Sequence, residues 1–258
     1  MTKIRVAAVS YLNTKPLLYG IKRHPIIHEI ELIEDYPARI AQMLIDDQVD
    51  VGLIPVAATL KLKDWNIVTE FCIGSTGPVA SVCIFSQVPI EQVKKVYLDY
   101  QSRTSVNLAK ILLHEYWKKD VQFVDAAGED FREQIKGSTA GVVIGDRALQ
   151  QRLKSEFIYD LGEAWQKHTG LPFVFAAWIA NKTLPSDFVN QFNEANSEGL
   201  KHLPDVIKEN PYGVYNLDEY YKKNISYNLT KEKREGMNIF LEKLIQLNSG
   251  AQSRVKGN

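Results

Sequence analysis

The residues best suited to chemistry come at the start of the chain, where an apolar segment runs directly into a polar elbow. After a predicted strand at residues 4–9, this elbow (residues 10–14) carries hydroxyl and amide side chains: Ser10, Tyr11, Asn13 and Thr14. Pro16 then favours the first turn of a helix, where its missing N–H is not needed. Such an elbow points donors at one spot outside the carboxyl end of a strand, where open α/β sheets hold small anionic ligands. A helix cap formed by Asn13 or Thr14 is the alternative.

A second group of donors opens a long amphipathic helix. Directly after a predicted strand at residues 95–100, the chain carries Ser102, Arg103, Thr104 and Ser105. A helix N-terminus with free N–H groups and several hydroxyls suits a carboxylate or a phosphate. We therefore predict an anion-binding site at this helix start. An ordinary serine cap with a solvated Arg103 is the alternative.

Two further turns and one histidine carry candidate site residues. Ser81 follows a Gly-Pro turn near a predicted crossing between lobes, and ligand clefts form at domain interfaces. A hydrogen-bonded core hydroxyl is the alternative for Ser81.

In the stretch VVIGDRAL, Gly145 permits close backbone approach, and Asp146 is a candidate base or helix cap. His168 is the best placed of the five histidines for acid–base chemistry, with a surface role as the alternative.

Composition limits the function classes. The 258 residues include 31 Lys and Arg against 31 Asp and Glu, so no global positive field favours nucleic acid or an anionic membrane. No apolar run approaches the roughly 20 residues of a membrane span. Cys72 and Cys83 have neither zinc nor disulfide spacing, and a charged strand beginning at Lys3 leaves no room for a targeting segment. We expect a cytoplasmic protein with a small-molecule ligand, no metal, and no nucleic-acid or membrane partner.

Several common enzyme classes lose their usual sequence support. The chain contains no GxGxxG, GxxxxGK[ST], HExxH or GxSxG motif. These motifs are typical of nucleotide binding, zinc proteases and serine hydrolases. The candidate donors must therefore serve another chemistry.

Predicted strands and helices alternate along much of the chain, which is typical of an α/β fold with right-handed crossovers and parallel strands. Strands are predicted at residues 4–10, 28–35, 49–55, 95–100, 121–126 and 140–146. Helices are predicted at residues 16–23, 37–48, 56–65, 102–119, 131–137 and 147–155. Residues 157–170 are rich in loop signals.

Two features divide the chain into two lobes. Residues 66–74 and 78–86 are consecutive apolar strands without a helix between them, and the chain becomes wholly helical after a long apolar strand at residues 171–182. The C-terminal helices have no strands of their own and need the first sheet to pack upon. The predicted division is lobe I at residues 1–84 and 175–248, lobe II at residues 85–174, and a disordered tail at residues 249–258. A single-crossing, two-domain protein is the alternative.

The motifs resemble one protein family over roughly residues 4–245. The resemblance is carried by SYLNTKPL, VDVGLIPVA, GPVASV, SRTSVNLAKILL, VVIGDRAL and DLGEAWQKHTGLPFVFAAW. This order of motifs is similar to the menaquinone biosynthetic family of the futalosine route, whose first enzyme is chorismate dehydratase. SYLNTKPL favours that enzyme over a sister enzyme of the pathway. The resemblance implies a type II periplasmic-binding-protein-like α/β fold, with two lobes joined by two hinge strands.

The resemblance also implies a reaction and its residues. The expected reaction is a hydro-lyase step that eliminates water from chorismate to give 3-enolpyruvylbenzoate, without a cofactor. The family's functional asparagine falls on Asn13, its functional serine on Ser81, and its Ser-Arg-Thr-Ser helix start on residues 102–105. We expect Asn13 and Ser81 to be catalytic. The expected substrate-binding residues are Ser10, Tyr11, Thr14, Ser102, Arg103, Thr104, Ser105, Gly145 and Asp146.

The substrate's own chemistry suggests how such residues would act. Chorismate becomes aromatic when it loses a ring proton and the neighbouring hydroxyl, so the driving force lies in the substrate. Because the motifs hold no obviously placed His, Glu or Lys base, we hypothesise that the enolpyruvyl carboxylate removes the proton. A protein base, Asp146 or His168, is the rival hypothesis. A module that binds a small carboxylate without turnover is the alternative function, since fold alone does not decide function.

Overall fold

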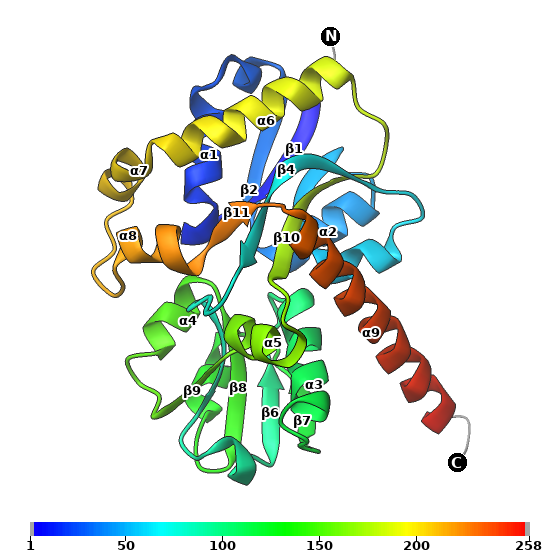
Figure 1. Ribbon diagram of the computed structural model, residues 1–258, viewed down its shortest axis with the longest axis vertical. Coiled ribbons are helices and arrows are strands. Elements are labelled where there is room, and N and C mark those ends of the chain that lie inside the picture. The colour runs from blue at the N-terminus through cyan, green and yellow to red at the C-terminus, as the bar shows by residue number, and fades with distance from the viewer. Residues whose placement is uncertain (1–2, 256–258) are drawn as a thin grey trace.

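The strands of the chain form two separate sheets (Figure 1). The computed structural model describes residues 3–255, with side chains described as far as residue 249. Sheet A has the order β11 (Ser226–Asn228), β4 (Asn66–Ser75), β10 (Phe173–Ala180), β3 (Val51–Pro55), β1 (Ile4–Val9) and β2 (Ile30–Asp35). Sheet B has the order β7 (Gln122–Asp125), β6 (Lys95–Leu98), β8 (Thr139–Ile144), β5 (Val82–Ser86) and β9 (Phe157–Asp160).

Each sheet has a parallel part and an antiparallel part. Strand β1 pairs in parallel with β2 and β3, and β6 pairs in parallel with β7 and β8. Strand β10 is antiparallel to β3 and β4, and β5 is antiparallel to β8 and β9. The predicted alternation therefore yields the parallel strands. The antiparallel strands are those next to the points where the chain passes from one sheet to the other.

Helices surround both sheets. Around sheet A lie α1 (Lys15–Arg23), α2 (Pro37–Ile45), α6 (Ser186–Lys201) and α7 (Leu203–Glu209), and with sheet B lie α3 (Thr104–Glu115), α4 (Asp146–Gln151) and α5 (Leu161–Thr169). The C-terminal part contains α8 (Leu217–Glu219), a π-helical turn (Tyr220–Asn224) and α9 (Lys231–Val255). Short 3₁₀ turns occupy Leu12–Thr14, Pro25–His28, Val56–Lys61, Ile90–Gln92 and Glu129–Gln134. No helix among residues 3–255 has the length and apolarity to cross a membrane.

The chain passes between the sheets twice. The first connection, residues 76–81, joins β4 in sheet A to β5 in sheet B, and the second, residues 161–172, contains α5 and returns the chain to β10. All strands of sheet B therefore lie within residues 82–160. The chain changes sheets at residues 76–81 and 161–172, and the lobe boundaries at residues 84 and 174 stay a prediction.

Three local expectations differ from the structure. Residues 157–170 form β9 and α5 rather than loops, because Asp160 caps α5 and Gly170 ends it in the left-handed conformation at φ 76°. The short edge strand β11 was not predicted. The expected disordered tail at residues 249–258 differs as well, since α9 continues to Val255 and residues 256–258 lie outside the described residues.

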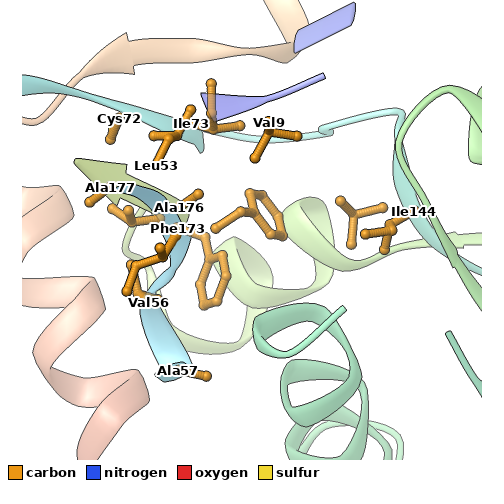
Figure 2. Packing of buried hydrophobic residues seen from close by; sticks show 14 of the residues in the cluster. Val9, Leu53, Val56, Ala57, Cys72, Ile73, Ile144, Phe173, Ala176 and Ala177 are labelled. Atoms are coloured by element: carbon orange, nitrogen blue, oxygen red, sulfur yellow. The ribbon is translucent and has the colours of Figure 1, made fainter. Parts of the chain in front are cut away.

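A buried apolar cluster extends from sheet A to the end of β8. Figure 2 shows Val9, Ile73 and Ala176, which come from β1, β4 and β10, with Ile144 of β8 on the far side of the cluster. All four side chains are buried. The two sheets therefore share apolar packing at the place where polar residues from both also meet.

Candidate active site

A pocket lies between the two sheets, next to this shared packing. Its cavity volume is about 50 Å³, smaller than the roughly 300–1,000 Å³ usual for small-molecule sites, so a ligand needs the two sides of the pocket to move apart. Its lining residues come from the elbow, the strand ends and the start of α3: Val9, Tyr11, Asn13, Pro37, Pro55, Ile73, Val82, Ser102, Thr104, Ser105, Ile144, Gly145, Phe175 and Ala176. Segments far apart in sequence thus meet in one pocket.

The elbow contributes Tyr11 and Asn13 to the pocket. The Asn13 side-chain oxygen accepts a hydrogen bond from the Thr14 hydroxyl at 3.1 Å, and its backbone carbonyl accepts one from Tyr227 at 2.9 Å. The Asn13 side-chain NH₂ group has no partner among the described residues. Thr14 is fully buried and Ser10 is exposed, and neither lines the pocket. The expectation that Ser10 and Thr14 contact the substrate is therefore corrected: Thr14 acts on Asn13, and Ser10 faces solvent.

At the start of α3, some hydroxyls make hydrogen bonds within the fold and one has no such bond among the described residues. The Ser102 hydroxyl accepts the Ser105 backbone N–H at 3.1 Å, which is the capping arrangement given above as the alternative. The Thr104 hydroxyl accepts the Ala57 backbone N–H at 3.1 Å and so joins α3 to the sheet A side. The Ser105 hydroxyl has no partner among the described residues. Arg103 is exposed and does not line the pocket, so the structure does not bring it together with the other donors of this helix start.

Gly145 lies at the end of β8 and lines the pocket opposite Tyr11. Its φ of +64° is in the left-handed region, and a Cβ atom added there would lie 2.6 Å from Tyr11 Cδ2. Only a residue without a side chain allows this contact. The predicted close backbone approach at Gly145 is present, and the partner is the Tyr11 ring.

Asp146 neither lines the pocket nor caps α4. Its carboxylate accepts the Leu12 backbone N–H at 3.0 Å, and its carbonyl accepts the Tyr212 hydroxyl at 3.0 Å. Burial raises the pKa of Asp146 above the usual aspartate value, while the bond from Leu12 opposes this shift. The structure therefore corrects the substrate-binding expectation for Asp146, because the side chain connects the two halves of the pocket from behind.

Ser81 also departs from the expected placement. Its side chain is fully buried and absent from the pocket lining, and its hydroxyl accepts a hydrogen bond from Tyr220 at 2.7 Å. Its backbone carbonyl accepts the Gly145 N–H at 2.8 Å. The prediction that Ser81 shares the pocket surface with Asn13 is wrong in this arrangement, because the β4–β5 connection turns the hydroxyl away. Ser81 instead contacts two residues that line the pocket. Val82 is its neighbour in sequence, and Gly145 is hydrogen-bonded to its backbone carbonyl.

His168 lies away from the pocket. Its ring is 3.1 Å from a Glu115 carboxylate oxygen, and Lys243 of α9 binds the same oxygen at 2.6 Å. Glu115 ends α3, whereas the pocket lies at the start of that helix, roughly 16 Å away at 1.5 Å per residue. His168 thus has the surface role given above as its alternative.

A polar network behind Tyr11 escaped the sequence analysis. The Tyr11 hydroxyl donates to the Gln101 side-chain oxygen, while the Gln101 NH₂ donates to Tyr100 at 2.8 Å. Beside them the buried Asp99 carboxylate binds Arg147 at 2.8 and 2.9 Å. Burial raises the pKa of Tyr11, so its hydroxyl remains a protonated donor. The sequence offered one local signal for this network, a predicted strand that contains Asp99 near its end. It gave no signal for the ion pair, because the partner Arg147 lies 48 residues away.

The pocket can bind and orient an anion but offers no side-chain base. Its polar lining consists of hydroxyls and one amide, with the N-terminus of α3 adding the favourable end of a helix dipole. Among the described residues that line it, none carries a carboxylate, imidazole, amine, guanidinium or thiol. Within the part of the chain that the structure describes, no group of three or more His, Cys, Asp or Glu residues could hold a metal ion.

The comparisons with known proteins agree with this picture. A family model described as menaquinone biosynthesis matches residues 4–246. A Thermus thermophilus protein named chorismate dehydratase is 27% identical over 263 residues, covering 91% of this chain and 92% of that protein. A Campylobacter jejuni protein of the same name is 26% identical over 238 residues, covering 87% and 91%.

Solved structures are similar in fold at low sequence identity. A Candida albicans protein described as having the generic periplasmic binding protein fold matches with a TM-score of 0.65 at 15% identity, covering 96% of this chain and 90% of that one. The periplasmic aliphatic sulphonate binding protein of Escherichia coli matches with a TM-score of 0.61 at 12% identity, covering 98% and 94%. These likenesses confirm the predicted periplasmic-binding-protein-like α/β fold.

Proposed function

The chain belongs to the menaquinone biosynthesis family, and from that premise we propose that it is a chorismate dehydratase. The reaction is a hydro-lyase step that converts chorismate into 3-enolpyruvylbenzoate and water. The observation that carries the proposal is the chemistry of the pocket lining. It is rich in groups that can donate hydrogen bonds to a carboxylate, and none of the described lining residues has a side-chain base. Two relatives that align with about nine-tenths of the chain have this name. A binding module without turnover is not favoured, because these relatives are named as enzymes.

In this proposal the start of α3 holds one substrate carboxylate. The Ser105 hydroxyl faces the pocket without a structural partner, and the helix N-terminus favours negative charge. Ser102 and Thr104 line the same end, and their hydroxyls, although each accepts a backbone N–H, keep an O–H to donate. All three hydroxyls can donate to this carboxylate, and that of Ser105 is the one without a structural hydrogen bond among the described residues.

Asn13 is the proposed catalytic residue. Its side-chain NH₂ group holds the enolpyruvyl carboxylate in position while that carboxylate removes the ring proton. The C–H electron pair forms the new ring double bond and the ring C–OH bond breaks with its own electron pair. The leaving hydroxide takes up the proton held by the enolpyruvyl carboxylate and departs as water, and the ring becomes aromatic. The enzyme contributes orientation and charge placement rather than a base of its own. Ser81 is a positioning residue in this scheme, because it acts through Gly145.

The contacts between the two halves of the pocket support exclusion of water. Direct hydrogen bonds join Leu12 to Asp146, Ala57 to Thr104, and the Ala38 N–H to the Gln101 carbonyl at 3.2 Å. These contacts enclose the pocket from several sides. A closed pocket strengthens the electrostatic contacts inside it and prevents side reactions.

The direct test is incubation of the purified protein with chorismate. We expect loss of the diene absorbance together with the appearance of 3-enolpyruvylbenzoate, identified by mass spectrometry. A metal chelator should leave the rate unchanged. Chorismate recovered intact after long incubation with folded protein would contradict the proposal and favour a binding module.

A further inference from the structure

A short C-terminal segment, residues 220–228, contacts two of the turns that form the pocket. It consists of the π-helical turn Tyr220–Asn224 and strand β11, which pairs with the edge of β4. Single π-helical turns are rare and occur frequently at functional sites. The segment contains three tyrosines that are at least nine-tenths buried, Tyr220, Tyr221 and Tyr227. None of the three lines the pocket.

Two of these tyrosines donate hydrogen bonds to residues of the proposed reaction. The Tyr227 hydroxyl donates to the Asn13 backbone carbonyl at 2.9 Å, across 214 positions of sequence. The Tyr220 hydroxyl donates to the Ser81 hydroxyl at 2.7 Å, and the Ser81 backbone carbonyl in turn accepts the Gly145 N–H. The Tyr220–Ser81 bond is buried and the Tyr227–Asn13 bond is part-buried, and the donating Tyr220 and Tyr227 side chains are at least nine-tenths buried, so the loss of either hydroxyl leaves its acceptor without that partner.

We propose that Tyr227 is a positioning residue for Asn13 and Tyr220 a positioning residue for Ser81. The inference rests on the proposed function. Tyr227 fixes the backbone from which the Asn13 NH₂ group reaches the pocket. A displacement of the reacting groups by about 1 Å costs on the order of a hundredfold in rate. Loss of either hydroxyl should therefore lower kcat rather than weaken substrate binding.

Tyr221 provides a matched control within the same turn. Its side chain is 2% exposed, and its buried hydroxyl has no hydrogen-bond partner among the described residues. Tyr221→Phe removes the same atom as Tyr220→Phe, at the adjacent position, without breaking a hydrogen bond. A role confined to packing predicts the same result for Tyr220→Phe and Tyr221→Phe.

The kinetic test compares three Tyr→Phe variants with chorismate as substrate. We expect Tyr227→Phe and Tyr220→Phe to lower kcat about tenfold with KM within about twofold of wild type, and Tyr221→Phe to leave both constants within about twofold. In an Asn13→Ala background, Tyr227→Phe should cost no further kcat, because its effect passes through Asn13. An unchanged kcat in Tyr227→Phe and Tyr220→Phe, or an equal loss in Tyr221→Phe, would overturn the inference.

A second readout separates this inference from the proposed function. Amide hydrogen exchange of residues 10–14, measured without substrate, should be about fivefold faster in Tyr227→Phe than in wild type and unchanged in Tyr221→Phe. Equal exchange in all three proteins would refute the positioning role even if chorismate is consumed. If wild type leaves chorismate intact, the proposed function fails and the exchange comparison still decides the positioning role. If Tyr227→Phe does not fold, Tyr220→Phe with exchange measured at residues 79–82 provides the same test.

Discussion

At the scale of single residues, the Ser105 hydroxyl can be removed without breaking a hydrogen bond of the fold. The Ser102 and Thr104 hydroxyls can also donate to a ligand, but each accepts a backbone N–H, whereas the Ser105 hydroxyl has no partner among the described residues. We predict that Ser105→Ala raises KM about tenfold, the equivalent of about 1.4 kcal/mol for a hydrogen bond to a charged group. Steady-state kinetics with chorismate measure this change.

Arg103 provides the control for Ser105, because it lies in the same helix start but is exposed and outside the pocket lining. Arg103→Ala should leave KM within about twofold of wild type, the range expected for a surface substitution. An unchanged KM in Ser105→Ala, or a larger change in Arg103→Ala, would count against a carboxylate at this helix.

Gly145 provides a second prediction at this scale. In Gly145→Ala, the new methyl group would lie 2.6 Å from the Tyr11 ring and force it out of place. We expect kcat/KM to fall at least tenfold, on the order of the loss from misplaced reacting groups. Gly137 is the matched control, because its φ is also positive at +54° but nothing lies within 4 Å of an added Cβ.

Both alanine variants should lose about 1–3 kcal/mol of stability because each places a side chain at a positive φ, and Gly145→Ala should lose more because it also crowds Tyr11. Only Gly145→Ala should lose activity. Thermal unfolding and turnover measured on the same preparations make the comparison. Full activity in Gly145→Ala would show that contact with Tyr11 does not shape the pocket.

Local patterns identified some site residues and misassigned others. Asn13, Ser105 and Gly145, chosen because each follows a strand or opens a helix, line one pocket, and their roles toward a substrate stay a prediction. Ser81 and Asp146 also follow that pattern, but contacts with Tyr220 and Leu12 draw their side chains away from the pocket. Those contacts span 139 and 134 positions. No spacing rule within one segment could reveal them.

At the scale of elements, Asp160 ties together the two connections between the sheets. Its carboxylate accepts backbone N–H groups from Val79 and Ala80 of the first connection, at 3.0 and 2.7 Å. It also accepts those of Gly162 and Glu163 at the start of α5, at 3.0 and 3.1 Å. Ala80 has a φ of 62°, unusual for a residue with a side chain, so this bond holds a strained turn.

Asp160→Ala would leave these backbone groups without their acceptor. We predict a loss of about 4 kcal/mol or more in the free energy of unfolding, measured by urea denaturation, since four donors lose their acceptor and each unsatisfied buried donor costs about 1–3 kcal/mol. Asp160→Asn, which retains one acceptor oxygen, should lose less. Glu163→Ala is the control, because its bridge to Lys167 is exposed and should contribute little. A loss in Asp160→Ala no larger than that of the control would refute this role.

The same residue explains why the sequence analysis missed α5. Residues 157–170 were interpreted as rich in loop signals, whereas Asp160 caps the helix and Gly170 terminates it. A nine-residue helix with strong signals at both ends closely resembles a loop in sequence. Strands with long apolar runs, such as β10, were predicted reliably because burial on both faces leaves a continuous pattern.

At the scale of the whole molecule, the order of strands explains the position of the pocket. Both connections pass between the sheets, so the elbow after β1 and the turn after β8 come to face each other. The sequence predicted two crossings because the C-terminal helices lack strands of their own. It could not predict the register that brings Tyr11 against Gly145, since that contact depends on how the two sheets pack.

The central claim is that elimination occurs without a protein base and depends on Asn13. Asp146→Asn provides the sharpest contrast, because an asparagine oxygen can still accept the Leu12 N–H while the basic carboxylate is lost. The decisive measurement is kcat at saturating chorismate for wild type, Asn13→Ala and Asp146→Asn. We predict that Asn13→Ala falls about a hundredfold, as expected for a group acting mainly in the transition state, and that Asp146→Asn stays within about threefold of wild type. Abolished turnover in folded Asp146→Asn, with Asn13→Ala near full rate, would contradict the account.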